Sequence, residues 1–254
     1  MANYLITGVS SGIGRDLTKR LVGQGHKVLG IARREKLLQD LKTELNATPK
    51  LEILSVDLAQ ENAWKVVLRR VIQRRFDPDV VIFNAAIFEK DYRNKSLDFS
   101  QMRRSFEINF FSIIKGFELL IKIVKPNTQF IFISSSSALK GSGAEGIGYP
   151  ASKAALSSAF ESLYQKYKKK YRLKIIYFGP ISTNMLPSAS RFTPILSPDQ
   201  AVEKIVRVIQ AYRVINYAPG ILFLFLRFIK VLPDYLYLTI LSLIDILHFK
   251  SSKK

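Results

Sequence analysis

The sequence predicts an α/β fold, a doubly wound parallel sheet of seven strands in a single domain that ends in apolar C-terminal helices. Three observations predict this fold. Short strand-like runs alternate with helical patterns along most of the chain, and two of the runs, VVIF and FIFIS, are almost continuously apolar, as in strands covered on both faces. The first run leads directly into a glycine-rich turn. This alternation favours a parallel sheet with helices on both sides.

The predicted strands are runs rich in β-branched, aliphatic and aromatic residues. They cover residues 3–7, 27–32, 51–56, 79–83, 128–134, 173–178 and 214–217. A helical pattern covers residues 60–75, with one apolar stripe formed by Trp64, Val67, Leu68, Val71 and Ile72. Before a helix over residues 201–211, Ser197 offers an N-cap and Pro198 a first helical residue. Residues 184–197 lack periodicity, and we expect a loop there that covers a ligand.

The composition excludes several classes of site. The chain has no cysteine, which excludes disulfide scaffolds, thiolate zinc sites and cysteine nucleophiles, and it has two histidines, so we expect no metal site. The 39 Lys and Arg residues against 20 Asp and Glu give a net charge of +19, which predicts attraction to nucleic acid, a phosphorylated cofactor or acidic lipid. The sequence shows no nucleic-acid-binding module, so no nucleic-acid partner is expected.

The glycine-rich turn after the first strand has the features of a pyrophosphate-binding site. Glycine permits a positive φ and a close approach to a phosphate, and the N-terminus of the following helix presents free N–H groups and a positive dipole end. Such a turn can join any strand to any helix, but its position after the first strand favours a dinucleotide. The expected cofactor-binding residues of this turn are Gly8, Ser10, Ser11, Gly12, Ile13 and Gly14.

Residues at the end of the second strand distinguish NAD from NADP. An acidic residue there would bind the ribose hydroxyls of NAD, and a basic one the 2′-phosphate of NADP. The sequence reads Ala32-Arg33-Arg34, so we expect NADP(H) rather than NAD, with Arg33 as first choice for the phosphate and Arg34 or Arg15 as helpers. Alternatively, these arginines are solvated charges on a basic surface. Asp57, after the third strand, is expected at the adenine, or else as a cap of the next helix.

Tyr149 and Lys153 are the candidate acid and its partner cation. They stand four residues apart, on one face of the helix that the pattern starts here. A nearby cation favours the phenolate and lowers the pKa of a tyrosine, which makes the phenol a usable acid near neutrality. Tyr164 and Lys168 have the same spacing, but they lie where the helix runs into a charged turn. Tyr149 is preferred because it follows a strand, a serine cluster and a glycine-rich loop.

With TGxxxGxG, a strand-end serine and YxxxK in this order, the sequence resembles the short-chain dehydrogenase/reductase family over residues 3–218. The resemblance implies a Rossmann-like domain over residues 1–218 that binds NAD(P) across its strand ends and transfers hydride to or from a carbonyl carbon. It implies that Tyr149 gives a proton to the carbonyl oxygen, that Lys153 holds the ribose, and that Asn109 anchors a water leading protons to the lysine. A catalytically idle NADP-binding sensor on the same fold is the alternative.

The resemblance leaves the substrate-binding serine open. Ser135 fits the strand-end pattern best, whereas Ser136 gives the more common interval to the tyrosine. The family's NNAG stretch reads FNAA at residues 83–86, so its first and last positions depart from the pattern. The remaining expected cofactor contacts are Asn84, Ala85, Ile181 and Thr183.

Residues 219–254 form an apolar extension. Spanning a bilayer takes ~20 mostly apolar residues, but Arg227, Lys230, Asp234 and Asp245 interrupt the run and Pro233 divides it. We expect two short amphipathic helices that lie on an anionic membrane surface. Packing on the core or on a second subunit is the alternative, since enzymes of this family commonly form homo-oligomers.

The sequence therefore predicts an NADPH-dependent oxidoreductase that reduces the carbonyl group, or oxidises the alcohol, of a small hydrophobic substrate. A tail at a membrane implies that this substrate is lipid-like. The N-terminal residues lack the charged region, long apolar run and cleavage site of a secretory signal. Together with the absence of cysteine, this favours a cytoplasmic protein, peripheral to the cytoplasmic face of a membrane.

Overall fold

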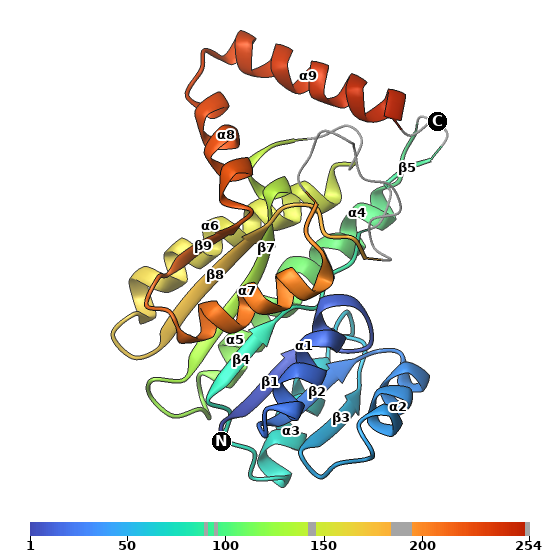
Figure 1. The fold of residues 1–254 in the computed structure, drawn as a ribbon, viewed down its shortest axis with the longest axis vertical. Coiled ribbons are helices and arrows are strands. Elements are labelled where there is room, and N and C mark those ends of the chain that lie inside the picture. Colours follow the sequence, from blue (N-terminus) through green and yellow to red (C-terminus); the bar gives the residue numbers. More distant parts are fainter. Residues whose placement is uncertain (89–90, 94–95, 142–145, 184–194, 252–254) are drawn as a thin grey trace.

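Parallel strands form the centre of the molecule. The structure is a computed structural model, and it describes residues 1–88, 91–93, 96–141, 146–183 and 195–251. The strands are β1 (Asn3–Thr7), β2 (Lys27–Ala32), β3 (Leu51–Ser55), β4 (Val80–Phe83), β7 (Gln129–Ser135), β8 (Arg172–Phe178) and β9 (Ile215–Ala218). They form one seven-stranded sheet in the order β3-β2-β1-β4-β7-β8-β9 (Figure 1). The order reverses between β1 and β4, so the crevice for a ligand is expected at the carboxyl ends of these two strands.

Helices cover both faces of the sheet and enclose a hydrophobic core on each side. On one face lie α3 (Ala63–Gln73), α5 (Ser112–Leu120) and α6 (Gly148–Tyr167). On the other lie α1 (Gly12–Gly23), α2 (Glu35–Glu44) and α7 (Pro198–Gln210). Successive strand residues point to opposite faces, so Leu5 of β1 packs in the first core and Ile6 in the second. This is the doubly wound architecture that the sequence predicts.

The element boundaries agree closely with the sequence prediction. Every predicted strand is present, with each end within one residue of its expected position. The predicted start of α7 is confirmed, because the Ser197 hydroxyl accepts a hydrogen bond from the Gln200 N–H and the Gln200 side chain accepts one from the Ser197 N–H. The expected ligand-covering loop falls mostly on residues 184–194, which lie outside the described residues.

Five short elements within the described residues are not expected from the sequence. Strands β5 (Tyr92–Arg93) and β6 (Ser96–Leu97) pair antiparallel, and α4 (Phe99–Phe106) follows them. A π-helical turn, η1 (Glu107–Phe111), joins α4 to α5, and a 3-10 turn, η2 (Ser136–Leu139), follows β7. Irregular turns of this kind often mark functional sites, and residues of both turns line the cavity described below.

Trp64, the only tryptophan of the chain, lies on α3 in the first core. At Gly116 of α5 a Cβ would lie 2.2 Å from the indole, so the helices can approach here only because position 116 is glycine. The ring of Phe83 meets the indole edge to face, with centroids 5.9 Å apart. Val67 is buried beside it as the helical pattern suggests, but Ile72 of the same predicted stripe is 61% exposed.

Two helices, α8 (Gly220–Lys230) and α9 (Asp234–Ser251), form the C-terminal extension and are separated at Pro233, as predicted. Figure 1 shows α8 rising from the sheet after β9 and α9 crossing above it. The residues that α8 buries are Phe223, Leu226 and Ile229. Its outward face is also apolar, with Leu224 68% and Phe228 64% exposed. Among the helices within the described ranges, none is long and apolar enough to span a membrane.

Candidate functional site

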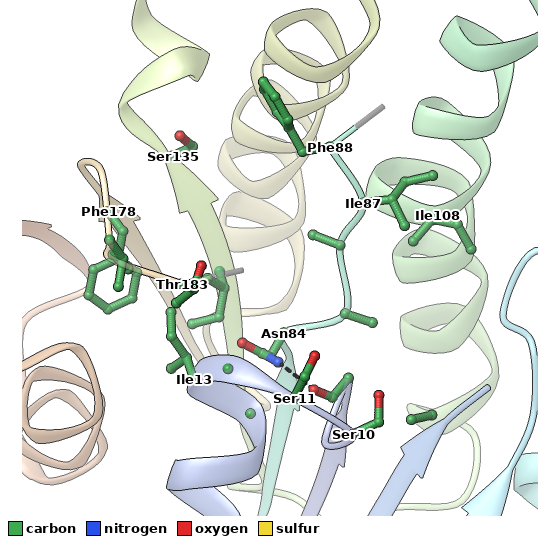
Figure 2. Close-up of a pocket in the computed structure, with 18 of the residues that line it drawn as sticks. Ser10, Ser11, Ile13, Asn84, Ile87, Phe88, Ile108, Ser135, Phe178 and Thr183 are labelled. Carbon is green, nitrogen blue, oxygen red and sulfur yellow. Dashed lines mark hydrogen bonds between the residues drawn. The ribbon is translucent and has the colours of Figure 1, made fainter. Parts of the chain in front are cut away.

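A cavity of about 470 Å³ opens at the carboxyl ends of the strands, where the strand order reverses between β1 and β4. Figure 2 shows the glycine-rich turn with Ser10 and Ser11 at one end of this cavity, and Phe88 and Ser135 at the other. Apart from the possible helper Arg15, the residues that the sequence predicts to bind the cofactor line it, and so do Ser135, Tyr149 and Lys153. The predicted cofactor residues found there are Gly8, Ser10, Ser11, Gly12, Ile13, Gly14, Arg33, Arg34, Asp57, Asn84, Ala85, Ile181 and Thr183.

The glycine-rich turn depends on close backbone contacts. Gly8 has a φ of 79°, a conformation that L residues with a side chain rarely adopt. At Gly14, a Cβ would lie 2.3 Å from the Gly8 carbonyl oxygen and 2.5 Å from Nδ2 of Asn84. The N-cap of α1, Ser11, makes no side-chain capping hydrogen bond, and the first turn of α1 contains no acidic residue. The N–H groups at the start of α1 are therefore available to an anion.

Asn84 and Thr7 fix the end of β4 against the turn. The Asn84 side chain donates hydrogen bonds from Nδ2 to the carbonyl oxygens of Thr7 (3.0 Å) and Gly8 (3.3 Å). The Thr7 hydroxyl in turn accepts from the N–H groups of Asn84 (3.1 Å) and Ala85 (3.0 Å). Sequence reasoning missed the role of Thr7, although Thr7 opens the glycine motif. Phe83, which departs from the family pattern, packs in the core rather than in the cavity.

The three arginines proposed for the phosphate differ in their contacts. Nη2 of Arg34 donates to the hydroxyls of Ser10 (2.8 Å) and Ser11 (2.6 Å), which places this guanidinium over the turn. The side chain of Arg33 lines the same cavity. Arg15 instead donates to the Leu37 carbonyl oxygen and forms an ion pair with Glu44, 2.8 Å away, and it is absent from the cavity lining. The structure thus does not bring Arg15 to the cavity, where its expected role as a helper for the phosphate would place it.

Asp57 lines the cavity, as its expected place at the adenine requires. Its Oδ1 also accepts a hydrogen bond from the Ala59 N–H (3.0 Å) and holds the turn that follows β3. Asp57 does not cap the next helix, because α3 begins at Ala63 and its N-cap is Asn62. One carboxylate oxygen can hold the turn while the other faces the cavity, so this bond is compatible with a contact to adenine.

Tyr149 and Lys153 lie on the first turns of α6, and both line the cavity. Lys153 is only 2% exposed, its Nζ donates to the Ile133 carbonyl oxygen (2.9 Å), and burial lowers its pKa to about 8. Nζ lies 6.0 Å from the centroid of the Tyr149 ring, and the ring of Phe88 meets that ring edge to face at 5.0 Å. The arrangement combines a phenol, a buried cation and an apolar wall. Such a set can deliver a proton to a substrate oxygen.

Both candidates for the substrate-binding serine, Ser135 and Ser136, line the cavity, so its position there does not decide between them. The Ser135 hydroxyl donates to the Ser137 hydroxyl (3.0 Å) and accepts from the Ser137 N–H (3.2 Å), so it caps η2. Tyr164, the competing tyrosine, stacks on Phe160 and is not part of the cavity lining.

Asn109 lies in the π-helical turn η1, is fully buried and does not line the cavity. Its Oδ1 accepts from the Ile87 N–H (2.9 Å), and its Nδ2 donates to the Ile87 carbonyl oxygen (3.0 Å) and to the Ser152 hydroxyl (3.1 Å). It thereby ties the chain after β4 to α6. The water-anchoring role expected for Asn109 stays a prediction.

Sequence reasoning also missed Asp91. Its carboxylate is fully buried and accepts hydrogen bonds from the backbone N–H groups of Ile147 and Gly148, at the start of α6. A lone acidic residue outside any periodic pattern carries no signal for such a contact. Only the folded arrangement of the segment after β4 reveals it.

Comparisons with known proteins match both the sequence and the fold of this chain. The sequence model of the family described as short chain dehydrogenase matches residues 2–193, which include the whole cavity lining. A fatty acyl-CoA reductase of Acinetobacter baylyi is 31% identical over 212 residues, covering 81% of this chain and 72% of the relative. An NADPH-dependent pterin aldehyde reductase of Arabidopsis thaliana is 26% identical over 185 residues, covering 72% and 76%. The solved structure of a short chain dehydrogenase/reductase from Burkholderia phymatum in complex with NAD has a TM-score of 0.78 at 15% identity, covering 89% of this chain and 92% of that one.

Proposed function

Since the chain belongs to the short-chain dehydrogenase family and is therefore an NAD(P)-dependent oxidoreductase acting on C=O or CH–OH groups, we propose that it reduces the carbonyl group of a hydrophobic substrate with NADPH. The observation that carries the proposal is the meeting of Tyr149, Lys153 and the strand-end serines in the same cavity as the glycine-rich turn. A protein that only sensed a nucleotide would not need this proton-transfer set.

The residues present fit a dinucleotide. Gly8 and Gly14 let the turn pack closely against Asn84 and Ala85, where a Cβ would clash, and the open N-terminus of α1 suits a pyrophosphate. The guanidinium of Arg34, held by Ser10 and Ser11, suits a 2′-phosphate at the same end of the cavity. We assign the other parts of NADPH to residues at the positions where the family binds them: the adenine to Asp57, the ribose to Lys153, and the nicotinamide amide and a phosphate to Ile181 and Thr183. Asn84 and Ala85 support the sheet beside the cofactor.

In the proposed reaction the cofactor supplies hydride to the carbonyl carbon, and the chain handles the proton and the charge. Tyr149 donates its phenolic proton to the carbonyl oxygen, where negative charge develops. Lys153, with its pKa lowered to about 8 by burial, is still mostly cationic near pH 7 and favours the phenolate that remains. The Ser135 hydroxyl donates a hydrogen bond to the same oxygen, and Asn109 orients the water that returns a proton toward Lys153.

Arg34→Ala tests the preference for NADPH. We expect the Kd for NADPH to rise about 10- to 100-fold, because charge-assisted hydrogen bonds contribute roughly 1.5–3 kcal/mol, while the Kd for NADH stays unchanged. Calorimetric titration of both nucleotides measures the two constants. Arg15→Ala is the matched control, since Arg15 is bound to Glu44 outside the cavity. Equal binding of NADPH and NADH by the unmodified chain would contradict the proposal.

The substrate end of the cavity favours an apolar molecule. Ile87, Phe88 and Phe178 line it (Figure 2), and one relative is named a fatty acyl-CoA reductase. Burial of one methylene contributes about 0.8 kcal/mol, or roughly a fourfold gain in kcat/KM. We therefore expect kcat/KM to rise along a series of ketones of increasing chain length. A flat series would argue against a lipid-like substrate.

We further propose that the extension lies on an anionic membrane surface. The outward face of α8 exposes Leu224 and Phe228, and the whole chain carries a net charge of +19, which attracts acidic lipid. The extension also adjoins the cavity, because a Cβ on Gly179, a lining residue, would lie 2.8 Å from the side chain of Leu222 on α8. A membrane at α8 would therefore lie beside the substrate end.

Vesicle flotation tests this placement. We expect the full chain to float with vesicles of phosphatidylcholine and phosphatidylserine but not with phosphatidylcholine alone, because the attraction is partly electrostatic. The double variant Leu224→Glu with Phe228→Glu should lose flotation. Val66→Glu with Ile72→Glu is the control, since it adds the same charge at exposed apolar positions of α3. Equal flotation of the two double variants would refute the role of α8.

A further inference from the structure

The first turn of α6 lacks a cap of its own. Its N-cap residue, Ile147, has an apolar side chain, and no acidic residue lies in the first helical turn. Free N–H groups at a helix start must find acceptors when they are buried. Gly148 is buried, so the acceptor has to come from elsewhere in the fold.

Asp91 supplies that acceptor from a segment 56 residues earlier in the chain. The Ile147 N–H lies 3.0 Å from both carboxylate oxygens, and the Gly148 N–H lies 2.5 Å from Oδ2. The surroundings are built around this contact, because a Cβ on Gly146, whose φ is 80°, would lie 2.0 Å from Oδ1. A fully buried carboxylate is stable only when it is bonded in this way.

The segment that carries Asp91 also contacts Tyr149. The ring of Phe88, three residues before Asp91, packs edge to face on the phenol ring, and Asn109 links the Ile87 backbone to Ser152 of α6. The Ser152 hydroxyl donates in turn to the Tyr149 carbonyl oxygen (2.8 Å). Ile87, Phe88 and Asp91 are thus each joined to the first turn of α6.

We propose that Asp91 is a positioning residue for the reaction: its buried carboxylate holds the first turn of α6 and thereby places the phenol of Tyr149 toward the substrate oxygen. This inference rests on the proposed function, because it concerns the delivery of the proton from Tyr149. Misplacing the phenol slows proton transfer while leaving the glycine-rich turn, and so the binding of NADPH, intact.

Asp91→Asn is the main test, because the amide has the same shape but replaces one acceptor oxygen by a donor that faces an N–H group. We expect kcat to fall at least about tenfold, with the Kd for NADPH nearly unchanged, and faster hydrogen exchange at the start of α6. Asp91→Glu keeps the charge and both acceptors and should recover part of the lost kcat. Asp79→Asn is the matched control, since Oδ2 of Asp79 also accepts a hydrogen bond from a backbone N–H, that of Asn3 at the amino end of β1 (2.8 Å), and Asp79 does not line the cavity. Its kcat should match that of the unmodified chain.

The outcomes separate this inference from the proposed function. An active parent chain whose Asp91→Asn variant keeps its kcat would overturn the inference alone. An equal loss of kcat in Asp79→Asn would overturn it too, since the loss of any bond between a carboxylate and the backbone would then have the same effect. A parent chain that binds NADPH but reduces no carbonyl would overturn the proposed function, and the inference with it. If Asp91→Asn does not fold, Gly146→Ala disturbs the same contact from the other side, and an unchanged kcat in that variant would overturn the inference.

Discussion

Replacement of Tyr149 by Phe should reduce kcat for carbonyl reduction by roughly 10²- to 10⁴-fold, the range that a general acid contributes. The substitution removes one hydroxyl and keeps the ring, so the edge-to-face contact with Phe88 should persist. The Kd for NADPH should change little, because the glycine-rich turn and Arg34 are untouched. Steady-state kinetics together with calorimetric titration of NADPH separates the two effects.

Tyr164→Phe is the matched control for this experiment. Tyr164 lies on the same helix, also stands four residues before a lysine, and has Lys168 5.4 Å from its ring centroid. It packs on Phe160 and does not line the cavity, so its loss should leave kcat unchanged. Unaltered turnover in Tyr149→Phe would remove the basis of the proposed mechanism. A loss in Tyr164→Phe equal to that in Tyr149→Phe would point to damage of α6 rather than to an acid.

Gly14→Ala should abolish measurable binding of NADPH or prevent folding of the turn. The new Cβ would lie 2.3 Å from a backbone carbonyl oxygen and 2.5 Å from Asn84, and neither group can move without displacing the end of β1 or β4. Overpacking of this kind costs about 1–3 kcal/mol of stability, and here the displaced atoms also form the anion site. Titration with NADPH and urea unfolding measure the two consequences.

Gly23→Ala, at the other end of α1, provides the comparison. A Cβ at Gly23 meets no heavy atom within 4 Å. Alanine in a helix is favoured over glycine by roughly 0.5–1 kcal/mol, so this variant should bind NADPH normally and be slightly more stable. Normal NADPH binding by Gly14→Ala would show that the cofactor does not use this turn.

Much of the fold could be predicted because its signals are local. Each apolar strand and the glycine-rich turn can be read within a few residues, and alternation of strands and helices is enough to imply the layers. The short hairpin of β5 and β6 and the π-helical turn η1 are different, because neither has a periodic pattern of its own. The conformation of η1 goes with contacts to distant parts of the chain, since Asn109 is bonded to Ile87 and to Ser152 of α6.

In the candidate site, too, the residues with a local sequence signal could be predicted and those that depend on long-range contacts could not. Residues of the glycine motif and the pair Tyr149 and Lys153 are recognisable from spacing, and the structure brings them into one cavity. The contacts of Arg34 and Arg15 depend on the rotamers of long side chains. Sequence spacing therefore cannot tell which of the two arginines reaches the cofactor site. The carboxylate of Asp91 meets its partners across 56 residues of chain. No local pattern can report a contact of that range.

The burial of Trp64 gives the protein a built-in optical reporter. A single indole, enclosed by Gly116 and Phe83 and with no hydrogen-bond partner for Nε1 among the described residues, should fluoresce at short wavelength in the native state. Its emission should shift to the red only when water reaches the core beneath α3. The helix α1 and the glycine-rich turn lie over the other core, on the opposite face of the sheet. A red shift of the emission in Gly14→Ala would therefore mean that the disturbance had spread across the sheet. An unchanged emission would mean that the disturbance had stayed on the face of α1.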